Sequence, residues 1–189
     1  MEFKVEKTEI RDLLIITPEV FQDDRGFFTE TYRKDKFDAF GLDATFVQDN
    51  HSRSIKNVVR GLHFQWDPPM GKLMRVTQGA AFLVAVDIRI GSPTFGKWKG
   101  VEASVENRKM VYAPAGFARG FCVVSDFAEI QYKCTGVYTS TKAESGILWN
   151  DPAIGIEWPV SNPILSKKDE EAQTLEQWIN NPEAKNFIY

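Results

Sequence analysis

The chain has 189 residues, of which 43% are hydrophobic, 13% aromatic and 26% charged, and its formal net charge is -3. This length and composition predict one globular domain over residues 1–189 and exclude a largely disordered chain. The sequence pI of about 5.5 argues against a nucleic-acid partner or a membrane-surface role, because both require an excess of basic residues.

Short strand patterns separated by turns dominate the chain. A strand pattern at residues 13–16 ends at a Thr-Pro pair, and a turn at residues 23–26 leads into a second pattern at residues 27–32. A short helix is predicted over residues 34–40, with Gly41 as its C-cap. Many short strands at this spacing predict an antiparallel sandwich or barrel. The strand patterns that follow cover residues 45–48, 58–65, 73–76, 80–86, 101–105, 110–112, 120–124 and 129–134.

The last of these patterns, residues 129–134, alternates between polar and apolar side chains. Ile130, Tyr132 and Cys134 therefore share one face of the strand. We expect Tyr132 to point into the barrel with its apolar neighbours. Near the end of the chain, residues 166–179 carry apolar side chains at helical spacing, which predicts a C-terminal helix.

Histidine and cysteine are scarce, since the chain contains only His51, His63, Cys122 and Cys134. A catalytic metal usually needs two or three imidazoles together with a carboxylate, so we expect no metal site. Two cysteines give no disulfide framework and favour a reducing compartment. The N-terminus lacks the apolar stretch of a signal peptide, and no apolar run is long enough to span a bilayer. We therefore expect a cytoplasmic protein with no membrane partner.

An imidazole and an ammonium group lie on two neighbouring predicted strands. His63 belongs to an Arg-Gly-Leu-His-Phe-Gln run at residues 60–65, and Lys72 to a Gly-Lys-Leu run at residues 71–73. From spacing alone, His63 is either a structural histidine or a catalytic base, and Lys72 is either a solvated charge or part of a site. Arg60 needs a partner if it is buried, which favours a polar cavity at this place.

Two further motifs allow a structural and a functional interpretation. Residues 114–121 resemble the second histidine motif of cupin barrels, Pro-x-Gly-x-x-His, but carry Arg119 at the metal-ligand position. A guanidinium binds a phosphate or carboxylate rather than a metal, and the alternative is an exposed arginine in a turn. Ser166 and Asp169 fit a capping box, whereas the functional alternative makes Asp169 the carboxylate that orients His63. Spacing leaves both questions open.

A series of motifs runs in order through nearly the whole chain, from about residue 9 to residue 175. The motifs are DRGFFTE at residues 24–30, VQDNHS at 47–52, VRGLHFQ at 59–65, GKL at 71–73, VAVDIR at 84–89, SPTFGKW at 92–98, YKCT at 132–135, WNDP at 149–152 and GIEWP at 155–159. The series resembles the dTDP-4-dehydrorhamnose 3,5-epimerase family. This resemblance implies a mainly β, cupin-like antiparallel sandwich or jelly roll with a few short helices and a C-terminal helix. It also implies a homodimer that needs neither a metal nor another cofactor.

The resemblance also assigns roles to particular residues. It implies that His63 is the catalytic base, that Asp169 orients it, that Tyr132 is the acid, and that Lys72 stabilises an enolate. Among the substrate-binding residues, Arg25 and Glu30 are expected to hold the nucleotide together with Gln48 and Asn50, and to reach into the neighbouring subunit. The full set of implied substrate-binding residues is Arg25, Phe28, Glu30, Gln48, Asn50, Arg60, Arg119, Tyr138, Glu144 and Lys168.

Two positions depart from the pattern of the family. Arg119 stands where the family usually has His, and Leu83 stands where it usually has Asp. Because the site gains a cation and loses an anion, we expect it to favour more negative ligand groups near this wall. Arg119 is expected to meet a phosphate or a sugar hydroxyl.

The activity implied by the resemblance is epimerisation at C3 and C5 of a dTDP-4-keto-6-deoxyhexose, from dTDP-4-dehydro-6-deoxy-D-glucose to dTDP-4-dehydro-L-rhamnose. A base and an acid on opposite sides of the ring suit this reaction, because a proton leaves one face and returns to the other. The alternatives are a mono-epimerase acting on C3 or C5 of a related nucleotide sugar, and a catalytically silent sugar-nucleotide binding protein. A metal-dependent cupin enzyme is disfavoured by Arg119 and by the scarcity of histidine.

Overall fold

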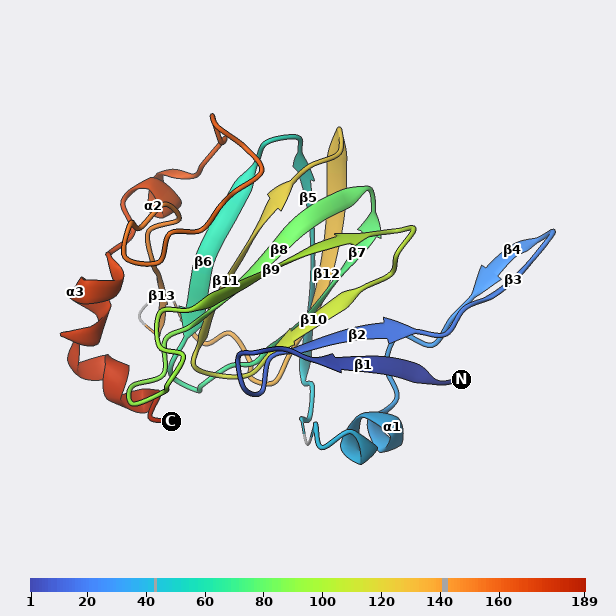
Figure 1. Cartoon of the computed structure of the whole chain (residues 1–189), viewed down its shortest axis with the longest axis horizontal. Helices are drawn as coiled ribbons and strands as arrows, with labels where there is room; N and C mark the ends of the chain where they lie inside the picture. The colour runs from blue at the N-terminus through green and yellow to red at the C-terminus, as the bar shows by residue number, and fades with distance from the viewer. Residues whose placement is uncertain (43, 141–142) are drawn as a thin grey trace.

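The computed structural model describes residues 1–42, 44–140 and 143–189. Two antiparallel sheets enclose the main core, and a two-stranded hairpin projects from one end (Figure 1). The antiparallel β-sandwich predicted from the sequence is therefore confirmed. The six-stranded sheet has the order β1 (Phe3–Lys7), β2 (Leu14–Pro18), β10 (Met110–Ala113), β7 (Lys72–Gln78), β12 (Phe127–Cys134), β5 (Gln48–Ile55). The five-stranded sheet has the order β13 (Glu144–Gly146), β6 (Val59–Gln65), β11 (Phe117–Val123), β8 (Ala80–Asp87), β9 (Trp98–Ser104), and the hairpin pairs β3 (Phe21–Asp23) with β4 (Gly26–Phe28).

The main core lies between the two sheets and contains residues from both. Met74 of β7 and Ile130 of β12 pack in one cluster with Leu83 of β8 and Phe117 of β11. Burial of these apolar side chains is the dominant favourable contribution to folding. Leu83, one of the two departures from the family pattern, is fully buried here, so it occupies a packing position.

Helix α1 (Lys34–Ala39) confirms the helix predicted over residues 34–40. It covers the six-stranded sheet through Phe37, which is fully buried. The ring of Phe37 makes edge-to-face contacts with Phe3 at 5.1 Å and with Tyr32 at 5.0 Å between centroids. Gly41 follows the helix with a φ of +80°, the left-handed conformation typical of a C-terminal glycine.

The helix predicted over residues 166–179 is interrupted, and two short helices replace it: α2 (Lys167–Glu170) and α3 (Leu175–Ile179). Between them, Gln173 forms a parallel bridge with Ile147, and its carbonyl accepts a hydrogen bond of 2.8 Å from the N–H of Leu148. Thr174 then begins α3 with a capping box. The helical spacing of the apolar residues is therefore overridden by the pairing of Gln173 with residues 147–148.

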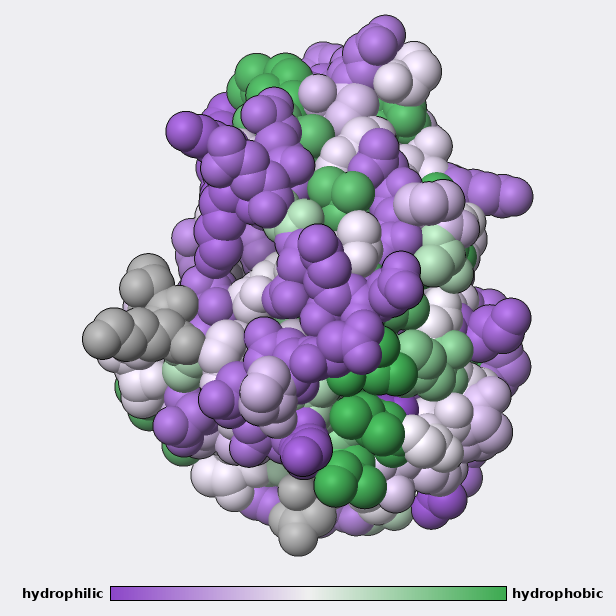
Figure 2. Space-filling model, turned by 90° about the vertical axis from the view of Figure 1, so that its left-hand side faces the viewer, coloured by the Kyte–Doolittle hydropathy of each residue, from purple (hydrophilic) through white to green (hydrophobic). Residues whose placement is uncertain are grey.

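The last residues complete the layer that covers the five-stranded sheet. After α3, a 3-10 helix, η1 (Pro182–Asn186), carries the chain back so that Phe187 is buried beside Trp178, with 6.0 Å between ring centroids. Trp178 also packs on Phe64 of β6 at 4.5 Å. Figure 2 views the side on which α2 and α3 lie and shows a mostly hydrophilic surface, consistent with inward-facing apolar groups. Among the described residues, no helix is both long and apolar enough to cross a membrane.

Candidate active site inside the sandwich

His63 and Asp169 form a hydrogen-bonded pair although 106 positions separate them in the sequence. His63 lies on β6 and Asp169 on α2, and the distance from Nε2 of His63 to Oδ1 of Asp169 is 2.6 Å. Ser166, the N-cap of α2, accepts from the main-chain N–H of Asp169 at 3.2 Å and donates its hydroxyl to Oδ2 at 2.8 Å. Asp169 therefore takes part in the helix start and also contacts the imidazole, so the geometry is compatible with both interpretations left open by the sequence.

The surroundings of Asp169 keep it ionised. Burial raises the pKa of this carboxyl, but hydrogen bonds from His63, Ser166 and the main-chain N–H of Gly61, together with the charge interaction with His63, outweigh burial and hold the pKa below its ordinary value. The residue is only 3% exposed. When Nε2 of His63 donates to this carboxylate, Nδ1 keeps its lone pair and can accept a proton.

Lys72 and Tyr132 lie on the six-stranded sheet. Lys72 begins β7, Tyr132 lies on β12, and Nζ of Lys72 is 4.7 Å from the centroid of the Tyr132 ring. This is a cation–π arrangement. Tyr132 faces the main core, where it packs against the cluster that includes Ile130, as the strand alternation predicts.

Burial shifts both groups toward their neutral forms. It lowers the pKa of Lys72 to about 8, with a further lowering by the positive charge of Arg119. It raises the pKa of Tyr132, although a hydrogen bond with Asn50 opposes this shift. At neutral pH, Tyr132 therefore keeps its phenolic proton and Lys72 is mostly an ammonium ion.

Arg119 connects the two walls of the interior. It is the register partner of His63 between β11 and β6, which places both side chains on the same face of the five-stranded sheet. From there its guanidinium donates at 2.8 Å to the carbonyl of Met70, in the loop between β6 and β7, and at 3.4 Å to that of Ala113 on β10 of the six-stranded sheet. At 3% exposure, Arg119 is not the exposed turn arginine that the spacing allowed.

Several predicted binding residues are linked to one another by hydrogen bonds. Nε2 of Gln48 donates to Oδ1 of Asn50 at 3.0 Å, and the main-chain N–H of Tyr138 donates to Oε1 of Gln48 at 2.8 Å. Lys168 of α2 and Glu144 of β13 form an ion pair of 2.7 Å. Both exert charge effects on Lys72, which places the pair near the interior cluster.

Arg60 belongs to β6, and its side chain bonds to residues of β5 in the other sheet. Its Nε donates to Oγ of Ser54 on β5 at 3.0 Å, and its guanidinium reaches the carbonyl of Arg53 at 3.4 Å. Its charge also acts on Tyr132. The sequence requires a partner for Arg60 only if the residue is buried. Arg60 is exposed, and it bonds to a hydroxyl and a carbonyl.

The remaining predicted residues lie apart from this cluster within the single chain. Arg25, in the turn between β3 and β4, pairs with Asp23 at 2.5 Å and is highly exposed, and Phe28 of β4 is 67% exposed. Glu30 follows the hairpin and contacts Arg33 at 3.5 Å. Figure 1 shows that this hairpin projects away from β6 and the C-terminal helices.

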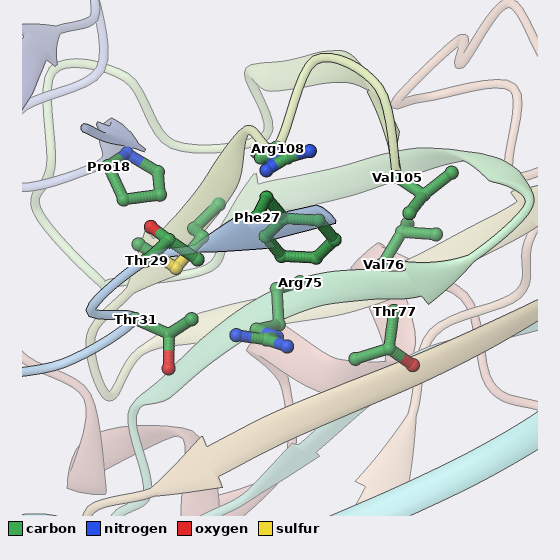
Figure 3. Close-up of a pocket in the computed structure, with 10 residues that line it drawn as sticks. Pro18, Phe27, Thr29, Thr31, Arg75, Val76, Thr77, Val105 and Arg108 are labelled. Atoms are coloured by element: carbon green, nitrogen blue, oxygen red, sulfur yellow. The ribbon is translucent and has the colours of Figure 1, made fainter. Parts of the chain in front are cut away.

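A separate pocket lies at the base of the hairpin (Figure 3). The ring of Phe27 lies beneath the guanidinium of Arg108, with 3.9 Å from its central carbon to the ring centroid, and Arg75 and Val76 of β7 also line the pocket. None of the predicted site residues lines it. We therefore keep the interior cluster as the candidate active site.

Three contributors to the cluster were not predicted from the sequence. Ser54 accepts from Arg60, the main-chain N–H of Gly61 donates to Asp169, and Cys134 is the register partner of Lys72. The alternation that placed Tyr132 inside the barrel was a usable signal for Cys134. Within the described part of the chain, no three His, Cys, Asp or Glu side chains are grouped so that they could hold a metal ion.

Comparison with known proteins assigns the chain to a family. A family model described as dTDP-4-dehydrorhamnose 3,5-epimerase matches residues 7–177. A dTDP-4-dehydrorhamnose 3,5-epimerase from Shigella flexneri is 56% identical over 165 residues, which cover 86% of this chain and 91% of that protein.

Two more relatives differ in the reaction that their names describe. The crystal structure of dTDP-6-deoxy-D-glucose-3,5-epimerase from Legionella pneumophila, in complex with dTDP-4-keto-L-rhamnose, is 43% identical with a TM-score of 0.91 and covers 99% of this chain and 98% of that chain. A dTDP-4-dehydrorhamnose 3-epimerase from Streptomyces niveus is 41% identical over 162 residues, covering 85% of this chain and 78% of that protein. The described architecture agrees with the cupin-like fold that the resemblance implied. With matches of this extent, the chain belongs to the dTDP-4-dehydrorhamnose 3,5-epimerase family, whose members are isomerases.

Proposed function

We propose that this protein epimerises C3 and C5 of a dTDP-4-keto-6-deoxyhexose and converts dTDP-4-dehydro-6-deoxy-D-glucose into dTDP-4-dehydro-L-rhamnose. The family match and the Legionella pneumophila relative with its bound dTDP-sugar support this choice of substrate. The observation that carries the proposed mechanism is the His63–Asp169 pair on one wall, with Lys72 and Tyr132 on the facing sheet.

In this mechanism, His63 removes a proton from the carbon next to the ketone. Asp169 holds the imidazole in the useful tautomer and stabilises the imidazolium ion that forms. The electron pair left on carbon moves onto the C4 oxygen and gives an enolate, whose negative charge the ammonium group of Lys72 stabilises. Tyr132 then donates its proton to the opposite face of the same carbon. Before the second carbon reacts, His63 releases its proton to solvent and Tyr132 takes one up from solvent, which restores both groups. The same steps at the second carbon complete the reaction, and neither carbon changes its oxidation state, so no redox cofactor is required.

Substrate recognition is assigned to the polar residues around this cluster. Arg60, Tyr138, Glu144 and Lys168 surround the sugar end in the proposal, and Gln48 and Asn50 bind the nucleotide. The hydrogen-bonded arrangement of Gln48, Asn50 and Tyr138 supports a pre-organised surface at this end of β5.

The hairpin residues enter the proposal through a homodimer. Arg25, Phe28 and Glu30 complete the nucleotide site of the neighbouring subunit, which accounts for a projecting hairpin with exposed aromatic rings. A mixing experiment tests this arrangement. Arg25→Ala and His63→Ala chains should each be weakly active alone, whereas their heterodimer contains one site with both residues intact and regains activity. If mixing restores nothing although heterodimers form, Arg25 acts within its own subunit.

Deuterium incorporation tests the reaction itself. Incubation with dTDP-4-keto-6-deoxyglucose in deuterated water should place deuterium at C3 and at C5, as resolved by NMR of the product. Label at C3 alone would select a 3-epimerase, an alternative favoured by the Streptomyces niveus relative. Tight binding of the nucleotide sugar without any label would instead indicate a silent binding protein and contradict the proposal.

A further inference from the structure

Arg119 bonds to two main-chain segments next to Lys72: the loop that precedes it and the neighbouring strand β10. Its two terminal nitrogens donate to the carbonyl of Met70, two positions before Lys72, and to the carbonyl of Ala113. Ala113 is the register partner of Lys72 between β10 and β7. Because Arg119 itself is anchored on β11, it acts as a strut from the five-stranded sheet to the start of β7.

The strut brings a second cation into the interior without a matching anion. Among the described residues, no carboxylate forms an ion pair with Arg119 or with Lys72, and Nε of Arg119 is buried with no hydrogen-bond partner. Burial lowers the pKa of Arg119 to about 10, so the guanidinium stays charged at neutral pH. Two like charges in a medium of low polarity oppose each other more strongly than they would in water.

Four charged or ionisable groups besides burial act on Lys72. Arg119 on β11 and Lys168 on α2 disfavour its positive charge, whereas Cys134 on β12 and Glu144 on β13 favour it. Lys168 is already paired with Glu144, which leaves Arg119 as the larger of the two repulsive contributions. The ring of Tyr132 faces the ammonium group as well.

We propose that Arg119 is a positioning residue, which fixes the main chain around Lys72 and opposes the positive charge of Lys72 inside the sandwich. Its burial and its carbonyl partners favour this action through Lys72 over the direct substrate contact predicted from the sequence. The catalytic consequence rests on the proposed function: an ammonium ion that gives up its proton near pH 8 stabilises an enolate at neutral pH and loses that capacity as the pH rises.

The direct test measures the protonation of Lys72 without using catalysis. Lys72 is partly buried, so a small reagent such as acetic anhydride reaches it, and mass spectrometry of the peptide reports the labelling rate against pH. The labelling midpoint of Lys72 in the unaltered protein should lie near 8. In Arg119→Met, which removes the charge and keeps much of the volume, the midpoint should rise from near 8 toward the ordinary lysine value of 10.5. Labelling at a fixed pH below the midpoint should slow about tenfold for each pH unit of that rise.

Arg119→Lys is the matched control because it keeps the charge and removes the forked hydrogen bonds. Its midpoint should stay close to that of the unaltered protein, whereas the loss of the strut should lower the midpoint of thermal unfolding in both variants. An unchanged labelling midpoint in folded Arg119→Met would overturn the proposal. If both variants fail to fold, a midpoint near the ordinary lysine value of 10.5 in the unaltered protein would overturn it equally.

A second measurement separates this proposal from the proposed function. If both hold, the fall of kcat at high pH lies near pH 8 in the unaltered protein and moves to higher pH in Arg119→Met. If the labelling midpoint moves but no epimerase activity exists, Arg119 still controls Lys72 and the proposed function fails. If activity exists and neither profile moves, the proposed function stands and the role of Arg119 is wrong.

Discussion

On the wall formed by β6 and α2, hydrogen bonds hold Asp169 in its charged form, whereas on the wall formed by β7 and β12, burial pushes Lys72 and Tyr132 toward their neutral forms. Both walls belong to one sandwich, and burial by itself favours the neutral form of the ionisable groups on each. The difference arises because Asp169 has three donors directed at it, while no carboxylate is bonded to Lys72 within the described residues. Partners therefore decide which form a buried ionisable group adopts.

The largest effect should follow from removing one proton-transfer group from each wall. We expect His63→Ala and Tyr132→Phe each to lower kcat by about 10² or more, because a general acid or base contributes 10²–10⁴. Exchange in deuterated water distinguishes the two walls. Tyr132→Phe should still exchange substrate protons through His63 without inverting the carbon, whereas His63→Ala should do neither. Near-full kcat in both variants would contradict the assigned roles.

A smaller loss is expected when the carboxylate of the first wall is neutralised. Asp169→Asn keeps the shape of the side chain but removes the charge that stabilises the imidazolium. Hydrogen bonds to charged groups contribute about 1.5–3 kcal/mol, which corresponds to a loss of kcat of about 10- to 100-fold. Substrate titration checks that KM changes less than kcat. An unaltered kcat would show that the contact between His63 and Asp169 is only structural.

The same substitution should alter acid stability. Since the pKa of Asp169 is depressed in the folded protein, its contribution to stability is present above the pKa of the unfolded chain, about 3.9, and is lost as the pH falls through the folded value. Urea unfolding at neutral pH and near pH 3 should therefore show a difference between the unaltered protein and Asp169→Asn that shrinks in acid. A difference independent of pH would contradict this account.

The smallest effect is expected for the hydroxyl behind the carboxylate. Ser166→Ala removes the N-cap of α2 and one donor to Asp169, which should cost about 0.5–2 kcal/mol of stability and lower kcat by less than Asp169→Asn. Thr174→Ala is the matched control, because it removes the cap of α3, a helix that carries none of the proposed catalytic residues. Urea unfolding should show similar losses for both, and only Ser166→Ala should affect kcat. Equal kcat for the two variants would show that the Ser166 cap of α2 does not affect catalysis.

Local patterns were sufficient for much of the fold, and they failed where pairing between distant segments intervened. The alternation in residues 129–134 correctly placed Tyr132 inside, because a strand with one buried face has only one allowed register. The strand predicted over residues 27–32 ends at Phe28, because only the short hairpin pairing sustains it. The edge strand β1 was not predicted from the sequence, because it buries little beyond Phe3. The burial of a single charged residue such as Arg119 could not be predicted from sequence patterns either.

By itself, the sequence determined the β-rich class of the fold, the inward position of Tyr132 and, through its ordered motifs, the family to which the chain belongs. Only the tertiary structure showed the contact between Asp169 and His63, which spacing left open and the resemblance implied. It alone decided that two helices replace one near the C-terminus and that Arg119 reaches the carbonyls of Met70 and Ala113. The physical reason is the separation along the chain of the residues that must come together. Periodicity reports which face of an element is buried, whereas a contact across 106 positions depends on how the sheets and the covering helices pack.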